Sequence, residues 1–131
     1  MERLLNAPCE NPDLYGTAAL AFIGDCVFEL LAREQLVCRG NCPAKKLHSG
    51  AVTMVNCAAQ AKAVEIIEPV LTEKESDVLR RGRNHSTSHT PKNASGADYH
   101  AATGLECLFG YLYLCGDITR IRELFALIYE E

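Results

Sequence analysis

The stretch that most constrains the fold is residues 20–31, LAFIGDCVFELL, which is apolar on almost every side and carries one aspartate, Asp25. Its apolar residues recur at the three- and four-residue spacing of an α-helix, so the pattern predicts a helix packed in the core. No residue one helical turn from Asp25 is basic, and Glu29 repels it. A carboxylate in apolar surroundings is costly unless a positive group meets it. Either a distant Lys or Arg or a bound cation is therefore expected to neutralise Asp25.

A second stretch, residues 103–114 with the sequence TGLECLFGYLYL, holds a single acid, Glu106, in an equally apolar pattern. Again no residue one turn away is basic. Thr103 and Gly110 share the helical stripe of Glu106, and such small residues let another helix or a ligand approach closely. Two acids without partners suggest a shared divalent-metal site, because Mg²⁺ prefers hard oxygen ligands. Salt bridges to distant basic residues are the alternative.

The rest of the chain shows helical periodicity and turn signals but no convincing strand. Thr72-x-x-Glu75 is a capping box, which predicts the start of a helix. Residues 1–12 are expected to be a loosely held lead-in, and residues 84–96 a polar, exposed loop. A chain of 131 residues buries a core as one domain, so we expect a single all-α domain over 1–131. The predicted helices span residues 13–35, 44–60, 61–67, 72–83, 97–115 and 118–129.

Three sets of residues are expected to face the core of this domain. The first helix should bury Leu20, Ile23, Val27, Leu30 and Leu31. The helix predicted over 44–60 should bury Leu47, Ala51, Met54, Val55 and Ala58. Three cysteines within apolar helical patterns are expected to be small core residues, namely Cys26, Cys57 and Cys107. Gly24, in the middle of the first helix, is explained by a close helix–helix or subunit contact.

Cysteine usage bears on the compartment and on metal binding. The chain has seven cysteines, an odd number, and no C-x-x-C pair, so we expect free thiols in a reducing cytoplasm. Cys38, Cys42 and His48 lack the regular spacing and the second pair of a zinc site. Polar residues interrupt the start of the chain, and no apolar run reaches transmembrane length, so we expect neither a signal peptide nor a membrane segment.

The formal net charge of −4 argues against an indiscriminate nucleic-acid binder, but a local basic patch is compatible with it. Residues 78–97 contain no acid, and they carry the basic side chains Arg80, Arg81, Arg83 and Lys92. With Asn84 and His85 as further polar groups, this segment is suited to phosphate contacts. Arginines that merely cap a helix, followed by a solvated loop, are the plainer interpretation. Weaker candidates for RNA contact are Lys62, Lys45 and Lys46.

Three ordered blocks of sequence resemble a known family. Residues 22–30, FIGDCVFEL, are similar to the signature helix of ribonuclease III catalytic domains, and residues 103–114 are similar to its second catalytic helix. The run RRGRN at 80–84, followed by PKN at 91–93, resembles the short bacterial branch of that family, Mini-ribonuclease III, which has no double-stranded-RNA-binding domain. The resemblance covers roughly residues 14–114.

The resemblance implies an all-α helical bundle of the ribonuclease III endonuclease type, a homodimer, and Mg²⁺-dependent cleavage of double-stranded RNA. It also implies maturation of large-subunit (23S) ribosomal RNA precursors as the cellular task. By motif match, Asp25 and Glu106 take the places of catalytic carboxylates that bind the metal. Candidate RNA contacts are Arg80, Arg81, Arg83, Asn84, His85, Lys92 and Lys62.

The chain departs from full-length ribonuclease III at two acidic positions. Ala21 stands where that family has a Glu, and Thr103 stands where it has an Asp. The short branch shares these losses, so they imply a metal site with fewer protein ligands and more water. Two other readings remain open on the sequence. One is a non-catalytic scaffold that binds RNA or ribosomal particles, and the other is a helical interaction domain with internal salt bridges.

Overall fold

The structure, a computed structural model, describes residues 2–5, 7–85 and 96–129. The described residues form helices and no strands, which confirms the all-α prediction. None of the described helices combines the length and the apolar composition needed to span a bilayer. The α-helices are α1 (Thr17–Arg39), α2 (Ala44–Val55), α3 (Cys57–Ile67), α4 (Glu73–Arg83), α5 (Gly96–Leu114) and α6 (Ile118–Ile128), with 3₁₀ turns η1 (Pro12–Leu14) and η2 (Glu68–Val70).

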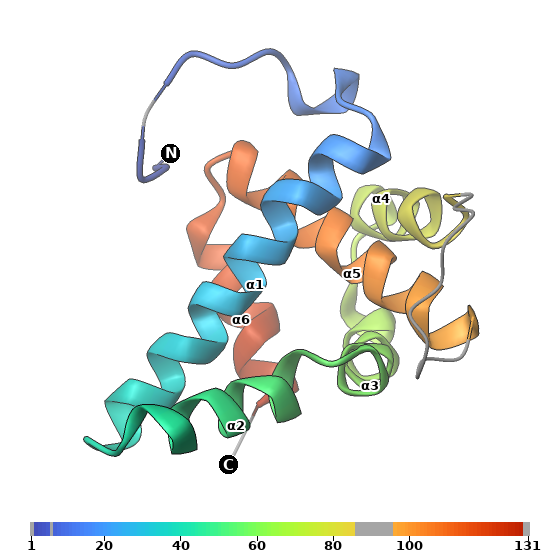
Figure 1. Cartoon of the computed structure of the whole chain (residues 1–131). Coiled ribbons are helices and arrows are strands. Elements are labelled where there is room, and N and C mark those ends of the chain that lie inside the picture. Colours follow the sequence, from blue (N-terminus) through green and yellow to red (C-terminus); the bar gives the residue numbers. More distant parts are fainter. Residues whose placement is uncertain (1, 6, 86–95, 130–131) are drawn as a thin grey trace.

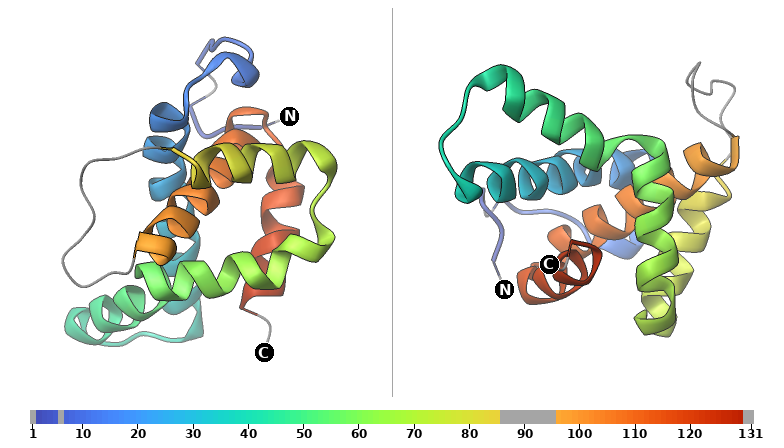
Figure 2. Two further views of the ribbon diagram at one scale, coloured as in Figure 1. Left: turned by 90° about the vertical axis from the view of Figure 1, so that its right-hand side faces the viewer. Right: turned by 90° about the horizontal axis from the view of Figure 1, so that it is seen from below.

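Helix α5 is the centre of the bundle. It packs against α1, α3, α4 and α6, which explains why its sequence is apolar on nearly every side (Figures 1 and 2). Helices α1 and α2 form a hairpin that extends to one side of the bundle (Figure 1). In the core, the ring of Phe28 meets the rings of Phe109 and Phe125 edge to face, at centroid distances of 5.2 and 5.7 Å. Aromatic pairs favour this arrangement.

Side-chain caps begin three of the α-helices, namely α3, α4 and α6. The predicted capping box is confirmed, because the N–H of Glu75 donates to Thr72 Oγ1 and the N–H of Thr72 donates back to the Glu75 carboxylate. The predicted boundary between residues 60 and 61 was wrong. Asn56 accepts a hydrogen bond from the N–H of Ala59 at 2.8 Å and so begins α3 four residues earlier, a role for which Asn is well suited. The first helix likewise runs over 17–39, since η1 is a separate turn.

Several residues predicted for the core lie at the surface. Cys26 and Ala58 are exposed, and Leu30 has 52% of its surface exposed. Leu20 and Cys107 are buried as predicted. The prediction for α1 was wrong because this helix is apolar on more sides than the rest of the chain covers. One apolar side of α1 therefore faces outward.

Two glycines let α1 and α5 cross with their backbones in contact. A Cβ atom added at Gly24 would lie 1.6 Å from the backbone oxygen of Glu106. One added at Gly110 would lie 2.1 Å from the backbone oxygen of Leu20. The close helix–helix contact predicted at Gly24 is therefore confirmed, and it fixes the relative position of the two helices at the two lone acids.

An ion pair joins the start of α4 to α6. The Arg120 guanidinium donates to both carboxylate oxygens of Glu75, at 2.8 and 2.9 Å, and to the backbone oxygen of Val70 at 2.8 Å. Burial raises the pKa of Glu75, but the hydrogen bonds from Arg120 and from Thr72 outweigh it and lower the pKa overall. A carboxylate with a lowered folded-state pKa adds stability above its unfolded-state pKa, and this contribution is lost as the pH falls through the folded-state value.

Arg120→Ala is expected to lower the free energy of unfolding by about 2–3 kcal/mol, because it leaves the Glu75 carboxylate buried without its cation. The control is Arg33→Ala, which removes an exposed pair with Glu29 on α1 and should change stability by about 0.5 kcal/mol or less. Chemical denaturation of the two variants measures both values. Equal losses in the two variants would contradict the structural role of Arg120.

Candidate active site

The crossing of α1 and α5 brings together the two acids that the sequence singled out. Asp25 follows Gly24 on α1, and the backbone of Glu106 itself touches Gly24. The side chains of Asp25 and Glu106 form a hydrogen bond with each other. Residues that are far apart in the sequence therefore place two carboxyl groups at one point.

The two carboxyl groups differ in burial. Asp25 is exposed, whereas Glu106 is only partly accessible. Burial and the neighbouring Asp25 carboxylate raise the pKa of Glu106 from its usual 4.5 to about 8, while a hydrogen bond from Gln60 opposes this rise. Without a cation, Glu106 therefore keeps its proton at neutral pH, because two adjacent carboxylates repel each other when both are charged.

Neither acid has a basic partner in the described part of the chain. The ion pairs there involve other acids: Glu29, Asp13, Asp77, Glu68, Glu75 and Glu123. Of the two explanations open on the sequence, pairing with a distant Lys or Arg is thus not what these residues show. Two carboxylates held together with their charges unbalanced are what a divalent cation stabilises.

The donor set suits a hard divalent cation such as Mg²⁺. Within the described ranges, no three or more His, Cys, Asp or Glu side chains lie together as possible metal ligands, and Cys38, Cys42 and His48 form no such group. Asp25 and Glu106 supply only hard oxygen ligands. An ion held by one or two carboxylates and several waters is the usual arrangement for Mg²⁺.

Gln60 is a residue of this site that the sequence interpretation missed. Its side chain is only 3% exposed and hydrogen-bonds to Glu106. With the helix placed from Cys57, Gln60 stands at the apolar spacing of the buried face, together with Ala63, Val64 and Ile67. Gln60 could have been found as a single polar residue on an otherwise apolar helix face. The wrong helix boundary at residue 60 concealed this pattern.

The basic end of α4 is anchored to α5 at Gly104, two residues before Glu106. A Cβ added at Gly82 would lie 2.9 Å from the Cα of Gly104, and one added at Gly104 would lie 2.7 Å from the backbone oxygen of Leu79. This contact holds the end of α4 at a fixed place on α5. The predicted RNA contacts on α4 are therefore carried by a rigid element.

The individual side chains on that end differ in their partners. Arg80 pairs with Asp77, and Arg83 pairs with Glu68 at 3.6 Å. Arg81 is exposed. Asn84 is the C-cap of α4. His85 Nδ1 hydrogen-bonds to Thr17 Oγ1 at 2.7 Å, so His85 ties the end of α4 to the start of α1.

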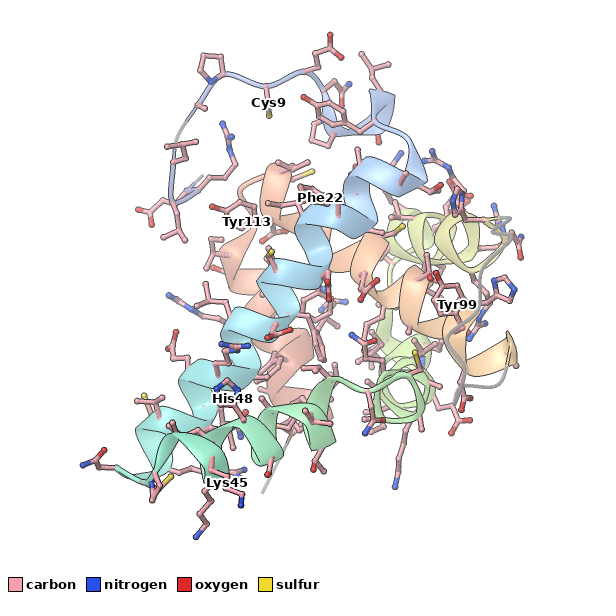
Figure 3. The ribbon with its side chains drawn as sticks, in the orientation of Figure 1. Cys9, Phe22, Lys45, His48, Tyr99 and Tyr113 are labelled. Atoms are coloured by element: carbon pink, nitrogen blue, oxygen red, sulfur yellow. The ribbon has the colours of Figure 1, made fainter. Side chains whose placement is uncertain are left out.

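The remaining basic candidates form no ion pair with Asp25 or Glu106 in the described part of the chain. Lys62 is exposed on α3, about 200° around that helix from the buried Gln60, at about 100° per residue. Lys45 and His48 lie on α2, on the side of the molecule away from Tyr99 at the start of α5 (Figure 3). Lys92 lies outside the described residues.

Comparison with known proteins identifies the family. The model of the Ribonuclease III domain matches residues 18–117. The chain belongs to the ribonuclease III family. This match includes both acids and the whole of the crossing between α1 and α5. Members of the family are double-strand-specific endoribonucleases that depend on a metal ion, and this chain is therefore such an enzyme.

Similar curated proteins place the chain within the family. It is 43% identical over 114 residues to the Mini-ribonuclease 3 of Symbiobacterium thermophilum, covering 87% of this chain and 88% of that protein. It is 44% identical over 108 residues to the Mini-ribonuclease 3 of a Thermoanaerobacter species, covering 82% and 76%. The resemblance to the Mini-ribonuclease III branch is thereby confirmed.

A solved structure supports the fold. The crystal structure of a Fusobacterium nucleatum protein aligns with 94% of this chain and 100% of its own, with a TM-score of 0.84 and 24% sequence identity. The helical bundle expected for the ribonuclease III family is therefore confirmed for this chain.

Proposed function

We propose that this ribonuclease III family enzyme is Mg²⁺-dependent, with Asp25 and Glu106 as its metal-binding carboxylates, and that it matures large-subunit (23S) ribosomal RNA precursors. The metal part rests on one observation: the two acids meet side chain to side chain, and neither has a basic partner among the described residues. The ribosomal RNA part rests on similarity to the Mini-ribonuclease 3 group. Free thiols at all seven cysteines suit a cytoplasmic enzyme.

Each acid has a distinct part in this proposal. Asp25 is exposed and therefore faces the substrate side of the site, whereas Glu106 is held from beneath by the packing of α5. Asp25 and Glu106 would hold the Mg²⁺ ion, which would supply Lewis acidity for activating water and balancing charge on the phosphodiester. Loss of the proton from Glu106 must accompany metal binding, because a ligating carboxylate is deprotonated.

We propose that duplex RNA also contacts the basic end of α4, beside the metal site. Double-stranded RNA is recognised by its shape through phosphate and 2′-hydroxyl contacts, for which arginines on a rigid helix are suited. Arg81 is exposed, and the ion pairs of Arg80 and Arg83 are at the surface, so phosphates can compete for them. Asn84 and His85 continue the same surface. Lys92 stays a prediction, and the position of Lys62 gives it no support.

We further propose that the enzyme is a homodimer joined through the exposed side of α1. Phe22 is 81% exposed and lies on one helical stripe with Cys26 and Leu30 (Figure 3). The last two line an apolar groove of about 580 Å³ that α1 forms with the end of α5 and with α6. A protruding aromatic side chain next to an apolar groove is self-complementary, which suits a two-fold interface. The dimer would present one pair of acids to each RNA strand.

Phe22→Glu is expected to convert the dimer into monomers at low micromolar concentration, because it places a charge at the centre of the interface. Loss of an aromatic anchor weakens association by about 30-fold or more. The control is Val52→Glu on α2, a residue 62% exposed and outside the groove, which should leave the dimer intact. Sedimentation equilibrium distinguishes the two. A dimeric Phe22→Glu variant would refute this interface.

The function is tested by incubating the purified protein with long double-stranded RNA, with Mg²⁺ and with a chelator in its place. The proposal predicts short duplex products with Mg²⁺ and intact RNA with the chelator. Single-stranded RNA of the same sequence is the control and should stay intact. Binding of the duplex without cleavage under all conditions would instead favour the scaffold, for which the absent acids at Ala21 and Thr103 are the argument.

A further inference from the structure

Gln60 is an unusual residue for its position. The polar side chains buried in the described part of the chain are Gln60, at 3% exposure, and Glu75, at 6%. Burying a polar group lowers stability unless it is hydrogen-bonded, so each needs a reason. The contacts of Glu75 with Arg120 and Thr72 join α4 to α6 and are structural. Gln60 instead contacts a residue of the proposed metal site.

The contact of Gln60 is with Glu106. Helix α3 packs along α5, and the buried face of α3 puts Gln60 against the Glu106 side chain, which in turn contacts Asp25. One line of side chains thus runs from α3 through α5 to α1. Asn56 caps α3 one turn before Gln60, so the backbone that carries Gln60 is fixed at that end.

We propose that Gln60 is a positioning residue for the metal site, an inference that rests on the proposed function. Its side-chain amide N–H donates to the Glu106 carboxylate and fixes the rotation of that group, so that Glu106 presents its remaining lone pairs toward Asp25. Groups that hydrogen-bond to metal ligands orient them in this way, and their loss weakens metal affinity by about 10- to 100-fold.

The amide is chemically suited to this part. A Lys or Arg at residue 60 would neutralise Glu106 and compete with a cation, whereas a Glu would add a third negative charge to the pair. An amide donates a hydrogen bond and carries no net charge. It therefore orients Glu106 while leaving the charge of the two acids available to a metal ion.

The experiment replaces Gln60 by Met, which keeps the length of the side chain and removes the donor. Mg²⁺ affinity by isothermal titration calorimetry is expected to fall about 10- to 100-fold, with the melting temperature of the metal-free protein nearly unchanged. Cleavage of duplex RNA should recover as Mg²⁺ is raised, since only metal binding is impaired. Glu65→Met is the control. It places a methionine on the exposed side of the same helix and should leave Mg²⁺ affinity unchanged.

The outcomes separate the two claims. Unchanged Mg²⁺ affinity in a folded Gln60→Met protein overturns the role of Gln60 and leaves the proposed function standing. A large fall in melting temperature with normal Mg²⁺ affinity also overturns it, since Gln60 would then be structural. A wild-type protein that binds no Mg²⁺ overturns the metal site itself and the role of Gln60 with it. Should Gln60→Met fail to fold, Gln60→Leu makes the same measurement.

Discussion

Glu106→Gln is expected to abolish duplex-RNA cleavage, by about 10³-fold or more in kcat, and at the same time to stabilise the metal-free protein. The two effects have one origin. Burial and the Asp25 carboxylate raise the pKa of Glu106 to about 8, so its charged form is unfavourable in the fold unless a cation is bound. The neutral amide removes the metal ligand and the repulsion together.

The pH dependence of stability gives this prediction its sign. The folded protein holds a proton on Glu106 up to about pH 8, whereas the unfolded chain loses it near 4.5. Between these values the folded state binds more protons, so the stability of the metal-free wild type falls as the pH rises. Melting temperatures in chelator should therefore converge for wild type and Glu106→Gln near about pH 5, and the variant should be the more stable above pH 8.

The matched control is Glu65→Gln, an exposed position on α3. It should cleave as the wild type does and show the wild-type change of melting temperature with pH. A Glu106→Gln protein that still cuts duplex RNA would remove Glu106 from the site. One that is less stable than the wild type above pH 8 would show that the charged carboxylate has a favourable partner.

Gly24→Ala is expected to disrupt the fold and the site together. The added Cβ would lie 1.6 Å from the backbone oxygen of Glu106 and 2.8 Å from the backbone nitrogen of Gly110. Neither atom can move without moving α5, so the two helices must separate. Overpacking of a core usually lowers the free energy of unfolding by about 1–3 kcal/mol, and a collision with the backbone should cost at least the upper value. We expect a loss of about 3 kcal/mol or more, or no soluble protein.

Any Gly24→Ala protein that does fold should cleave poorly, because displacement of α1 from α5 separates Asp25 from Glu106. The control is Gly96→Ala in the first turn of α5, where a Cβ meets nothing within 4 Å. That change should be neutral or slightly stabilising, since Ala favours helix by about 1 kcal/mol over Gly. Denaturation curves of both variants, with cleavage assays on what folds, check the prediction. Normal stability of Gly24→Ala would contradict the crossing.

Local patterns in the sequence gave the helices and the two acids, because each depends on neighbours in the chain. Thr72 and Glu75 signal a helix start through contacts three residues apart, and Asp25 stands out because its own helix offers it no cation. The misplaced helix boundary between residues 60 and 61 hid one residue of the site. Asn56 was not read as a cap, so Gln60 fell at a helix end and its place on a buried face went unnoticed.

The sequence did not reveal which side of α1 is buried, because that depends on which side the other helices cover. Residues 20–31 are apolar all round, and hydrophobicity alone does not tell a core face from a face meant for a second molecule. Cys26 and Leu30 were therefore predicted to be buried, whereas they line an open groove. Similarly, the charge of Arg80 and Arg83 was evident, but their surface pairing with Asp77 and Glu68 needs the tertiary structure.

The central claim is that Asp25 and Glu106 bind one divalent ion, and that this binding displaces the proton held by Glu106. Calorimetric titration of the metal-free protein with Mg²⁺ at about pH 7, in buffers of different ionisation enthalpy, counts the protons released. With the pKa of Glu106 at about 8, we predict release of close to one proton per site in the wild type. Asp25→Asn and Glu106→Gln should each show little or no binding. Tight Mg²⁺ binding without proton release, or equal binding in either variant, would contradict the claim.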